Sequence, residues 1–261
     1  MALFEFELAR VEDIVPWGEP GDQSLSWFAL TDGRFRVLVG DQVLFQYTEE
    51  ILCHWKVAMR EAEYQVAAFA RDILGSVAAG VAKLPEDIER LAANWDLLTQ
   101  LRKQSDADDS EQADDDLSYN AWRWLGERSP WTSYLVANPS FQFVRIGDEL
   151  HIHWDNRERL IDGIPVWTAH YGVHVLPVGS FLDECRNFAN RLLDTMDDRI
   201  DEIETKAVRP QIEVDARSLR QQHATWRDEF ASYFNEYKPD LPWSETQSAL
   251  RALAEKRGVR F

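Results

Sequence analysis

Residues 141–154 are Phe-Gln-Phe-Val-Arg-Ile-Gly-Asp-Glu-Leu-His-Ile-His-Trp, and this stretch decides the class of fold. Two runs rich in β-branched and aromatic residues, 141–146 and 149–154, flank the dipeptide Gly147-Asp148. A two-residue connection that contains glycine is typical of a β-hairpin, because the tight turn needs backbone angles that glycine adopts without strain. The stretch therefore predicts two antiparallel strands.

The first third of the chain has the same pattern. Residues 3–8 alternate between apolar and acidic side chains, as in a strand with one buried face. Asp32-Gly33 and Gly40-Asp41 each separate two β-rich runs, so each dipeptide predicts a further hairpin turn. The strands predicted here are 3–8, 27–31, 34–39 and 42–47.

Apolar residues recur every three to four positions in five other stretches, which predicts amphipathic helices. Thr48 can cap the first, Pro85 opens the second, and Ser180 with Asp183 forms a capping box at the third. The predicted helices span residues 48–77, 85–103, 180–209, 215–238 and 244–258, with Gln247 as the capping partner of Ser244. Hairpins with segregated helices predict an α+β fold with antiparallel sheet elements.

The order of elements is similar in the two halves, since residues 165–170 and 173–176 predict a third and a fourth strand after the hairpin. Each half has paired strands, a Trp-led strand, a Gly turn at Gly33 or Gly172, and a helix, so an internal duplication is one hypothesis. Four segments are expected: residues 1–104 as the first half, 105–116 as an acidic disordered linker or loop, 117–208 as the second half of the same domain, and 209–261 as a helical C-terminal extension.

The chain of 261 residues has 46 Asp and Glu against 28 Lys and Arg, a net charge of −18. This balance argues against a nucleic-acid groove, which needs clustered basic residues. No apolar run is long enough for a membrane span, and the N-terminus lacks a secretory pattern. Two cysteines form no disulfide framework. We therefore expect a soluble cytoplasmic protein that binds neither nucleic acid nor membrane.

Residues 105–116 (SDADDSEQADDD) hold seven acids and no base. Such a segment buries too little surface to offset the entropy lost on ordering, so a solvated linker is expected. An EF-hand calcium loop is excluded, because the segment has no Gly at the sixth position and no Glu at the twelfth.

The well-marked catalytic motifs are absent from the sequence. Gly75 and Gly80 have the spacing of a phosphate-binding loop, but Val81-Ala82 replace its Lys-Ser/Thr pair. Cys53 and His54 are adjacent on a predicted helix and point about 100° apart, which argues against a nucleophile–base pair. Cys53 and Cys185 are expected to be small, partly buried hydrophobic residues.

His151, His153 and Asp155 alternate along a predicted strand and therefore share one face. Two imidazoles and a carboxylate are competent ligands for zinc or iron. On the other interpretation, the apolar residues between them face the core and the polar three form the solvated face of a half-buried strand. We favour this second interpretation and expect no cofactor.

Eleven tryptophans are many for a chain of this length. One group lies in phase with apolar faces and is expected in the core: Trp27, Trp55, Trp154, Trp167 and Trp226. Another group lies in irregular stretches: Trp17, Trp122, Trp124, Trp131 and Trp243. Tryptophans there pin loops to the core or anchor a partner. The candidate binding residues are Trp17, Trp122, Trp124 and Trp131.

Three strings resemble a bacterial family of unknown function: WGEP at residues 17–20, SLSWFALTDG at 24–33 and DGIPVWTA at 162–169. The resemblance includes residues 122–126 and the helix from Phe181, and covers about residues 1–208. That family has no assigned activity, so the resemblance implies no catalytic residue. The order of hairpin and helix is also similar to that of toxin-immunity proteins, which are acidic cytoplasmic binders.

These observations predict a non-enzymatic, acidic binding protein that recognises another protein with a basic surface, with an immunity or defence role as its narrower form. Complementary charge speeds such encounters and makes them sensitive to salt. The alternative is a metal-assisted hydrolase that uses the face formed by His151, His153 and Asp155. The oligomeric state is left open.

Overall fold

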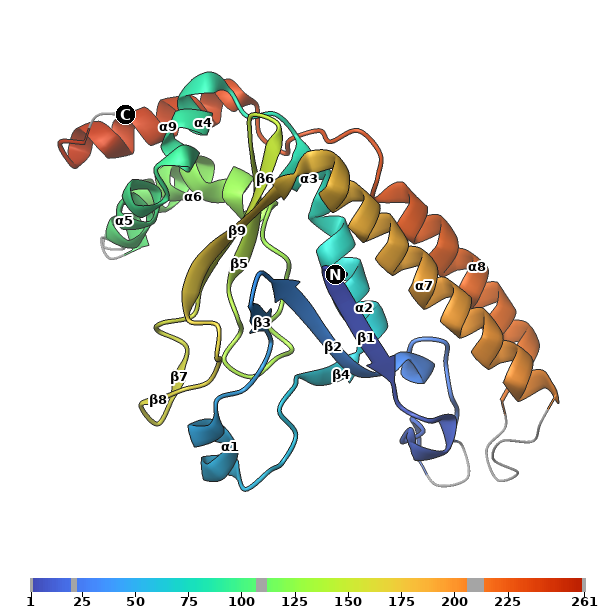
Figure 1. Cartoon of the computed structure of the whole chain (residues 1–261). Helices are drawn as coiled ribbons and strands as arrows, with labels where there is room; N and C mark the ends of the chain where they lie inside the picture. The colour runs from blue at the N-terminus through green and yellow to red at the C-terminus, as the bar shows by residue number, and fades with distance from the viewer. Residues whose placement is uncertain (1, 20–22, 107–111, 206–213, 260–261) are drawn as a thin grey trace.

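The computed structural model describes residues 2–19, 23–106, 112–205 and 214–259 (Figure 1). Two antiparallel sheets and one short hairpin are packed by long helices. The predicted α+β class is therefore confirmed. None of the helices in these ranges is both long enough and apolar enough to cross a membrane.

The first sheet is built on strand β2 (Asp32–Val39). Strand β1 (Phe4–Leu8) pairs along one edge of β2, and a short helical turn, η1 (Val11–Asp13), follows it. On the other edge, β3 (Gln42–Leu44) pairs with the end of β2 and β4 (Glu63–Gln65) with its start. Gly40, between β2 and β3, has a φ of 66°, as the predicted hairpin turn requires.

The segment before β2 differs from the prediction. Residues 27–31 are not a strand but a turn followed by the 3-10 helix η2 (Ala29–Thr31), and Asp32-Gly33 begins β2 instead of forming a hairpin. A Cβ atom at Gly33 would lie 2.3 Å from the carbonyl oxygen of Glu7. Glycine is required there because β1 passes so close, and not because the chain turns.

The second sheet has the order β5-β6-β9. The hairpin of β5 (Phe141–Ile146) and β6 (Glu149–Asp155) turns at Gly147-Asp148 as predicted. Strand β9 (Tyr171–Pro177) pairs with β6 and contains the predicted strand 173–176.

The predicted strand 165–170 is wrong. Only the two residues of β8 (Ile164–Pro165) are extended, and they pair with β7 (Leu160–Ile161). Trp167 makes an isolated bridge to Tyr47 and is buried. The apolar residues around it in the sequence are therefore explained by packing between the halves of the chain and not by a sheet strand.

The predicted helix 48–77 is interrupted. Helix α1 (Glu49–Trp55) begins as expected, because the Thr48 hydroxyl accepts a hydrogen bond from the Ile51 N–H at 3.2 Å. It ends at Lys56, whose φ is 58°. The chain then contributes β4 to the first sheet before α2 (Val66–Gly75) and α3 (Val77–Val81), so strand pairing overrides the helical periodicity.

The predicted helix 85–103 is divided at Asn94 into α4 (Glu86–Ala93) and α5 (Trp95–Asp106). Helix α6 (Gln112–Gly126) follows. Helix therefore occupies both ends of the segment expected to be a disordered linker, residues 105–116, and 107–111 lie outside the described residues.

Helix α7 (Val178–Thr205) begins two residues before Ser180, so the predicted capping box with Asp183 does not start it. Its predicted end near Pro210 lies outside the described residues. Helix α8 (Ala216–Ser232) begins as expected, with the Asp215 carboxylate accepting from the Ser218 N–H at 3.1 Å.

Helix α9 (Trp243–Lys256) follows Pro242, so Ser244 is not its cap. Gln247 instead donates to the Asp87 carboxylate of α4 at 2.8 Å. The predicted capping box is wrong because the side chain is used in a contact between helices.

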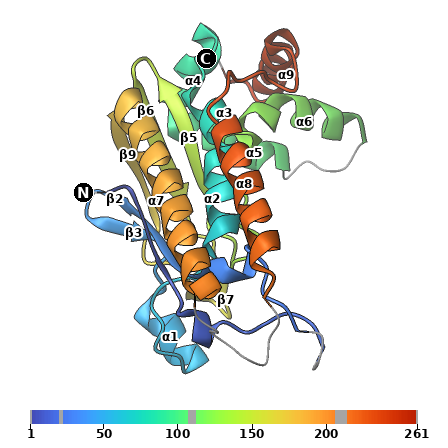
Figure 2. The ribbon, with the colours of Figure 1, turned by 90° about the vertical axis from the view of Figure 1, so that its right-hand side faces the viewer.

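The buried apolar residues of the described ranges form two hydrophobic cores. The larger lies between the two sheets and α2, α7 and α8, which Figure 2 shows side by side. The smaller lies on the other side of the second sheet, where α4, α5, α6 and α9 pack on Val144 of β5. Helix α9 thus shares a core with α4, α5 and α6. The glycine turns expected at Gly33 and Gly172 are not observed, because both residues lie inside strands.

Candidate functional site

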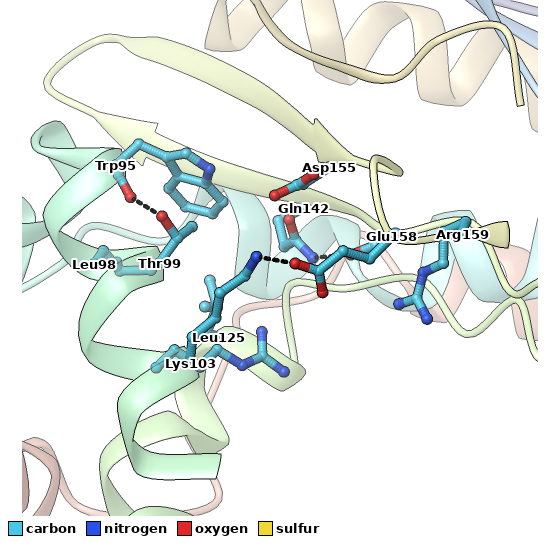
Figure 3. Close-up of a pocket in the computed structure, with 11 residues that line it drawn as sticks. Trp95, Leu98, Thr99, Lys103, Leu125, Gln142, Asp155, Glu158 and Arg159 are labelled. Carbon is cyan, nitrogen blue, oxygen red and sulfur yellow. Dashed lines mark hydrogen bonds and ion pairs between the residues drawn. The ribbon is translucent and has the colours of Figure 1, made fainter. Parts of the chain in front are cut away.

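A hollow of about 330 Å³ opens where α5 faces the second sheet and the chain that follows β6 (Figure 3). Helix α5 forms one wall, and Leu125 of α6 adds apolar surface. The wall from α5 consists of Trp95, Leu98, Thr99, Arg102 and Lys103. The opposite wall consists of Ser140, Gln142, Asp155, Glu158 and Arg159.

A second hollow of about 280 Å³ continues the first, because four residues line both: Arg102, Ser140, Gln142 and Arg159. The loop of residues 127–140 between α6 and β5 forms much of its wall and contributes Trp131, which is 61% exposed. We call the two hollows together the groove.

The acidic side chains of the groove are paired with bases. The Lys103 ammonium contacts a Glu158 carboxylate oxygen at 2.7 Å across the groove (Figure 3). Arg157 contacts the Asp155 carboxylate at 2.7 Å and lowers the pKa of that carboxyl by this hydrogen bond. The charges of Asp155 and Glu158 are therefore partly compensated from within the protein.

Two basic side chains of the groove are not paired in this way. Arg102 and Arg159 are half-buried, and neither guanidinium makes an ion pair or hydrogen bond with any residue that the structure describes. The backbone of each arginine is anchored. Arg102 lies on α5, which is held by the buried side chains of Leu98 and Leu101, and the Arg159 N–H donates to the Asn156 carbonyl at 3.0 Å. The groove thus carries two positive charges on an anchored backbone, and neither is paired with an acid of the described residues.

A serine between the arginines is held by two buried polar residues. The Ser140 N–H donates to the Asn156 side-chain oxygen at 2.8 Å, and the Gln142 amide donates to Ser140 Oγ at 3.0 Å. Gln142 is 6% exposed and Asn156 is 4% exposed. Because Ser140 Oγ accepts from Gln142, its own O–H remains to donate into the groove.

The histidine row is not the solvated strand face that the sequence predicts. His153 is buried and stacks on Trp95, with ring centroids 3.8 Å apart and planes 6° from parallel. Burial, with a smaller contribution from His151, lowers the pKa of His153 to about 3. The apolar residues between the polar three face the larger core, as expected.

The geometry of the three residues lends no support to the metal alternative. Asp155 is held by Arg157, and the described ranges contain no group of three or more His, Cys, Asp or Glu side chains that could hold a metal ion. His151, His153 and Asp155 share a strand face, but helix α5 covers its centre, so they do not form a metal site.

The candidate binding tryptophans divide into two pairs. Trp131 at the groove and Trp17, which is 54% exposed and packs edge-on against Phe28, lie at the surface. Trp122 and Trp124 are 7% and 2% exposed and belong to the smaller core. Helix α6 turns both indoles inward, so their burial matches the alternative of pinning to the core and leaves little surface for a partner.

The two cysteines differ in exposure. Cys53 is exposed, contrary to expectation, while its neighbour His54 contacts Asp162 at 3.1 Å. Cys185 is buried as expected, and burial raises the pKa of its thiol.

The groove residues that sequence reasoning missed are Trp95, Arg102, Ser140, Gln142 and Arg159. They come from three separate segments, and no motif links them. The one local signal is Arg102-Lys103, a basic pair directly before the acidic run.

The fold and the groove define an α+β protein with two antiparallel sheets, two helical layers and a surface groove with uncompensated positive charge. The chain matches the family of unknown function DUF5984 over residues 3–249 and belongs to that family. The expected membership of an uncharacterised family is thus confirmed, and the match reaches α9, beyond residue 208. No curated protein and no solved structure matched the chain.

Proposed function

We propose that this protein is a non-enzymatic binding protein whose partner is another protein. The observation that carries the proposal is Trp131, an indole 61% exposed at the edge of a groove. Exposed tryptophan is over-represented among the residues that dominate binding energy at protein interfaces.

The loop that presents Trp131 is held in place. The next residue, Thr132, is buried, and its hydroxyl contacts Asn138 Oδ1 at 2.6 Å and the Pro139 carbonyl at 2.7 Å. The Trp131 ring packs edge-on against Tyr134, which in turn stacks on Tyr64. A side chain fixed before binding loses little conformational entropy on association, which favours affinity.

The partner we propose has a basic surface. The net charge of −18 belongs to the whole chain, and at long range it would attract such a partner and slow the approach of an acidic one. Close to Trp131 the two groove arginines are positive, so the basic surface of the partner would face the acidic surface outside the groove. An immunity or defence role is the narrower form of this proposal and is supported only by the same charge. The metal-assisted hydrolase is not proposed again, because its three residues make other contacts.

The test begins with capture of partners from a lysate of the source organism at low and high salt. Affinities of the purified partner are then measured for the wild type, Trp131→Ala and Trp17→Ala. Val57→Ala, a truncation at another exposed apolar residue, is the control. We expect Trp131→Ala to weaken binding by about 2 kcal/mol or more. Equal affinity of wild type and Trp131→Ala would refute the proposal, and binding that strengthens with salt would refute the basic partner.

A further inference from the structure

We propose that the groove binds an anionic group, a carboxylate or a phosphate, between Arg102 and Arg159. This inference goes beyond the proposed function and does not depend on it, because it concerns a small chemical group and not a protein partner.

The donor set fits an anion. Each guanidinium presents N–H groups in a planar fork that matches two oxygens of a carboxylate or phosphate. Arg102 of α5 and Arg159 of the opposite wall line both hollows, so the two walls of the groove each supply a guanidinium donor. Ser140, which also lines both hollows, adds a hydroxyl donor.

The absence of internal partners for these arginines contrasts with the rest of the chain. Acids outnumber bases by 46 to 28, so an arginine easily finds a carboxylate. Arg36 and Arg220, for example, each contact more than one acid. Within the described residues, Arg102 and Arg159 contact none, although Asp155 and Glu158 line the same hollow. Those two acids are occupied by Arg157 and Lys103.

The scaffold behind the donors is built from buried polar groups. Gln142 and Asn156 fix Ser140, and Asn156 also fixes the backbone of Arg159 through its carbonyl. The second amide hydrogen bond of Asn156 goes to the Ala169 carbonyl at 3.0 Å. Such a connected network keeps donors oriented before a ligand arrives, which strengthens binding.

The experiment titrates the full chain with inorganic phosphate and, separately, with acetate, following the arginine side-chain N–H signals by NMR. Sodium chloride at matched ionic strength controls for screening. We expect saturable shifts of the Arg102 and Arg159 signals with at least one of the anions and not with chloride. Saturation by phosphate alone assigns a phosphoryl ligand, and saturation by acetate alone assigns a carboxylate.

Variants then test the residues. Arg102→Gln and Arg159→Gln should each weaken anion binding about tenfold or more, and Ser140→Ala several-fold. Arg217→Gln, at an exposed arginine of α8, removes the same charge away from the groove and should change nothing. Circular dichroism establishes that each variant is folded.

The inference is overturned if neither anion gives saturable shifts, or if the folded Arg102→Gln, Arg159→Gln double variant binds like the wild type. Because neither readout involves Trp131 or a protein partner, these failures are distinct from failure of the proposed function.

Discussion

Arg128 and Arg102 lie close to the same part of helix α6 but have opposite surroundings. Leu125 of α6 lines the groove, while Arg128, three residues further on, is fully buried beside the smaller core. The Arg128 guanidinium lies over the rings of Trp124, Tyr237 and Trp243 at 5.3–5.6 Å and donates to the Trp124 carbonyl at 2.7 Å. We call these three rings the aromatic cage.

The difference shows two uses of one side chain. In the aromatic cage the charge is stabilised by π faces and a carbonyl, and the arginine connects α6 to the C-terminal segment. In the groove, Arg102 and Arg159 have no such contacts with the described residues. Substitution of Arg128 should therefore lower the free energy of unfolding. Substitution of a groove arginine should weaken anion binding and leave the free energy of unfolding almost unchanged.

The largest effect is expected from the tryptophans of the two regions. Trp124→Ala removes a buried indole from the cage and should destabilise the protein by about 3–5 kcal/mol. Trp131→Ala, at the groove, should cost less than about 1 kcal/mol, because its indole is mostly exposed. Urea unfolding followed by circular dichroism measures both. Similar losses for the two variants would break the distinction between cage and groove.

A somewhat smaller loss is expected from Arg128→Ala, about 3 kcal/mol, since it leaves a cavity among three rings and an unpaired carbonyl. Arg128→Met, which keeps the length of the side chain without its charge, should recover part of the loss by packing. Thermal melts at one pH compare the three proteins. If Arg128→Ala melts with the wild type, the cage does not stabilise the fold.

The stability of the protein should depend on pH through His153, which lies under Trp95 of the groove wall. The pKa of His153 is lowered from 6.5 to about 3 under Trp95, so the unfolded chain binds a proton that the folded chain does not. Stability from this group is present above pH 6.5 and is lost as the pH falls toward 3, by at most about 1.4 kcal/mol per pH unit. Urea unfolding of wild type and His153→Phe, which keeps a ring on Trp95, isolates the effect.

The variant must be compared with the wild type at each pH, because another buried group changes the stability in the opposite direction. Burial raises the pKa of Asp72 to about 6, so its contribution is lost as the pH rises through that value. The free energy of unfolding of the wild type, minus that of His153→Phe, should become smaller as the pH falls below 6.5, because only the wild type loses stability through His153. A difference that stays constant with pH would mean that His153 is protonated as readily in the folded protein as in water.

The smallest effect is expected in the groove itself. Arg102→Gln and Arg159→Gln should change the free energy of unfolding by less than about 0.5 kcal/mol, because neither side chain holds a partner among the described residues. Differential scanning calorimetry of the two variants measures this. A drop in melting temperature as large as that of Arg128→Ala would place these arginines with the fold and weaken the case for the anion site.

The sequence by itself determined the elements whose signals are local. The turns at Gly40 and Gly147, the cap at Thr48, the helix start at residue 215 and the buried face of β6 were all predicted. Each depends on backbone angles or hydrogen bonds within a few residues, or on an alternation along one strand. The α+β class follows from these elements together.

The tertiary structure alone decided which periodic segments remain continuous and which side chains meet. Residues 63–65 form a strand despite their helical periodicity because they pair with β2. His153 is buried because Trp95 of α5 stacks on it. Trp122 and Trp124 faced inward for a similar reason, since α9 closed their core from the far end of the chain. Arg102 and Arg159 are 57 positions apart in the sequence, and only the packing of α5 against the second sheet brings both to one groove. Contacts between distant segments leave no spacing in the sequence, and that is why the candidate site could not be predicted from it.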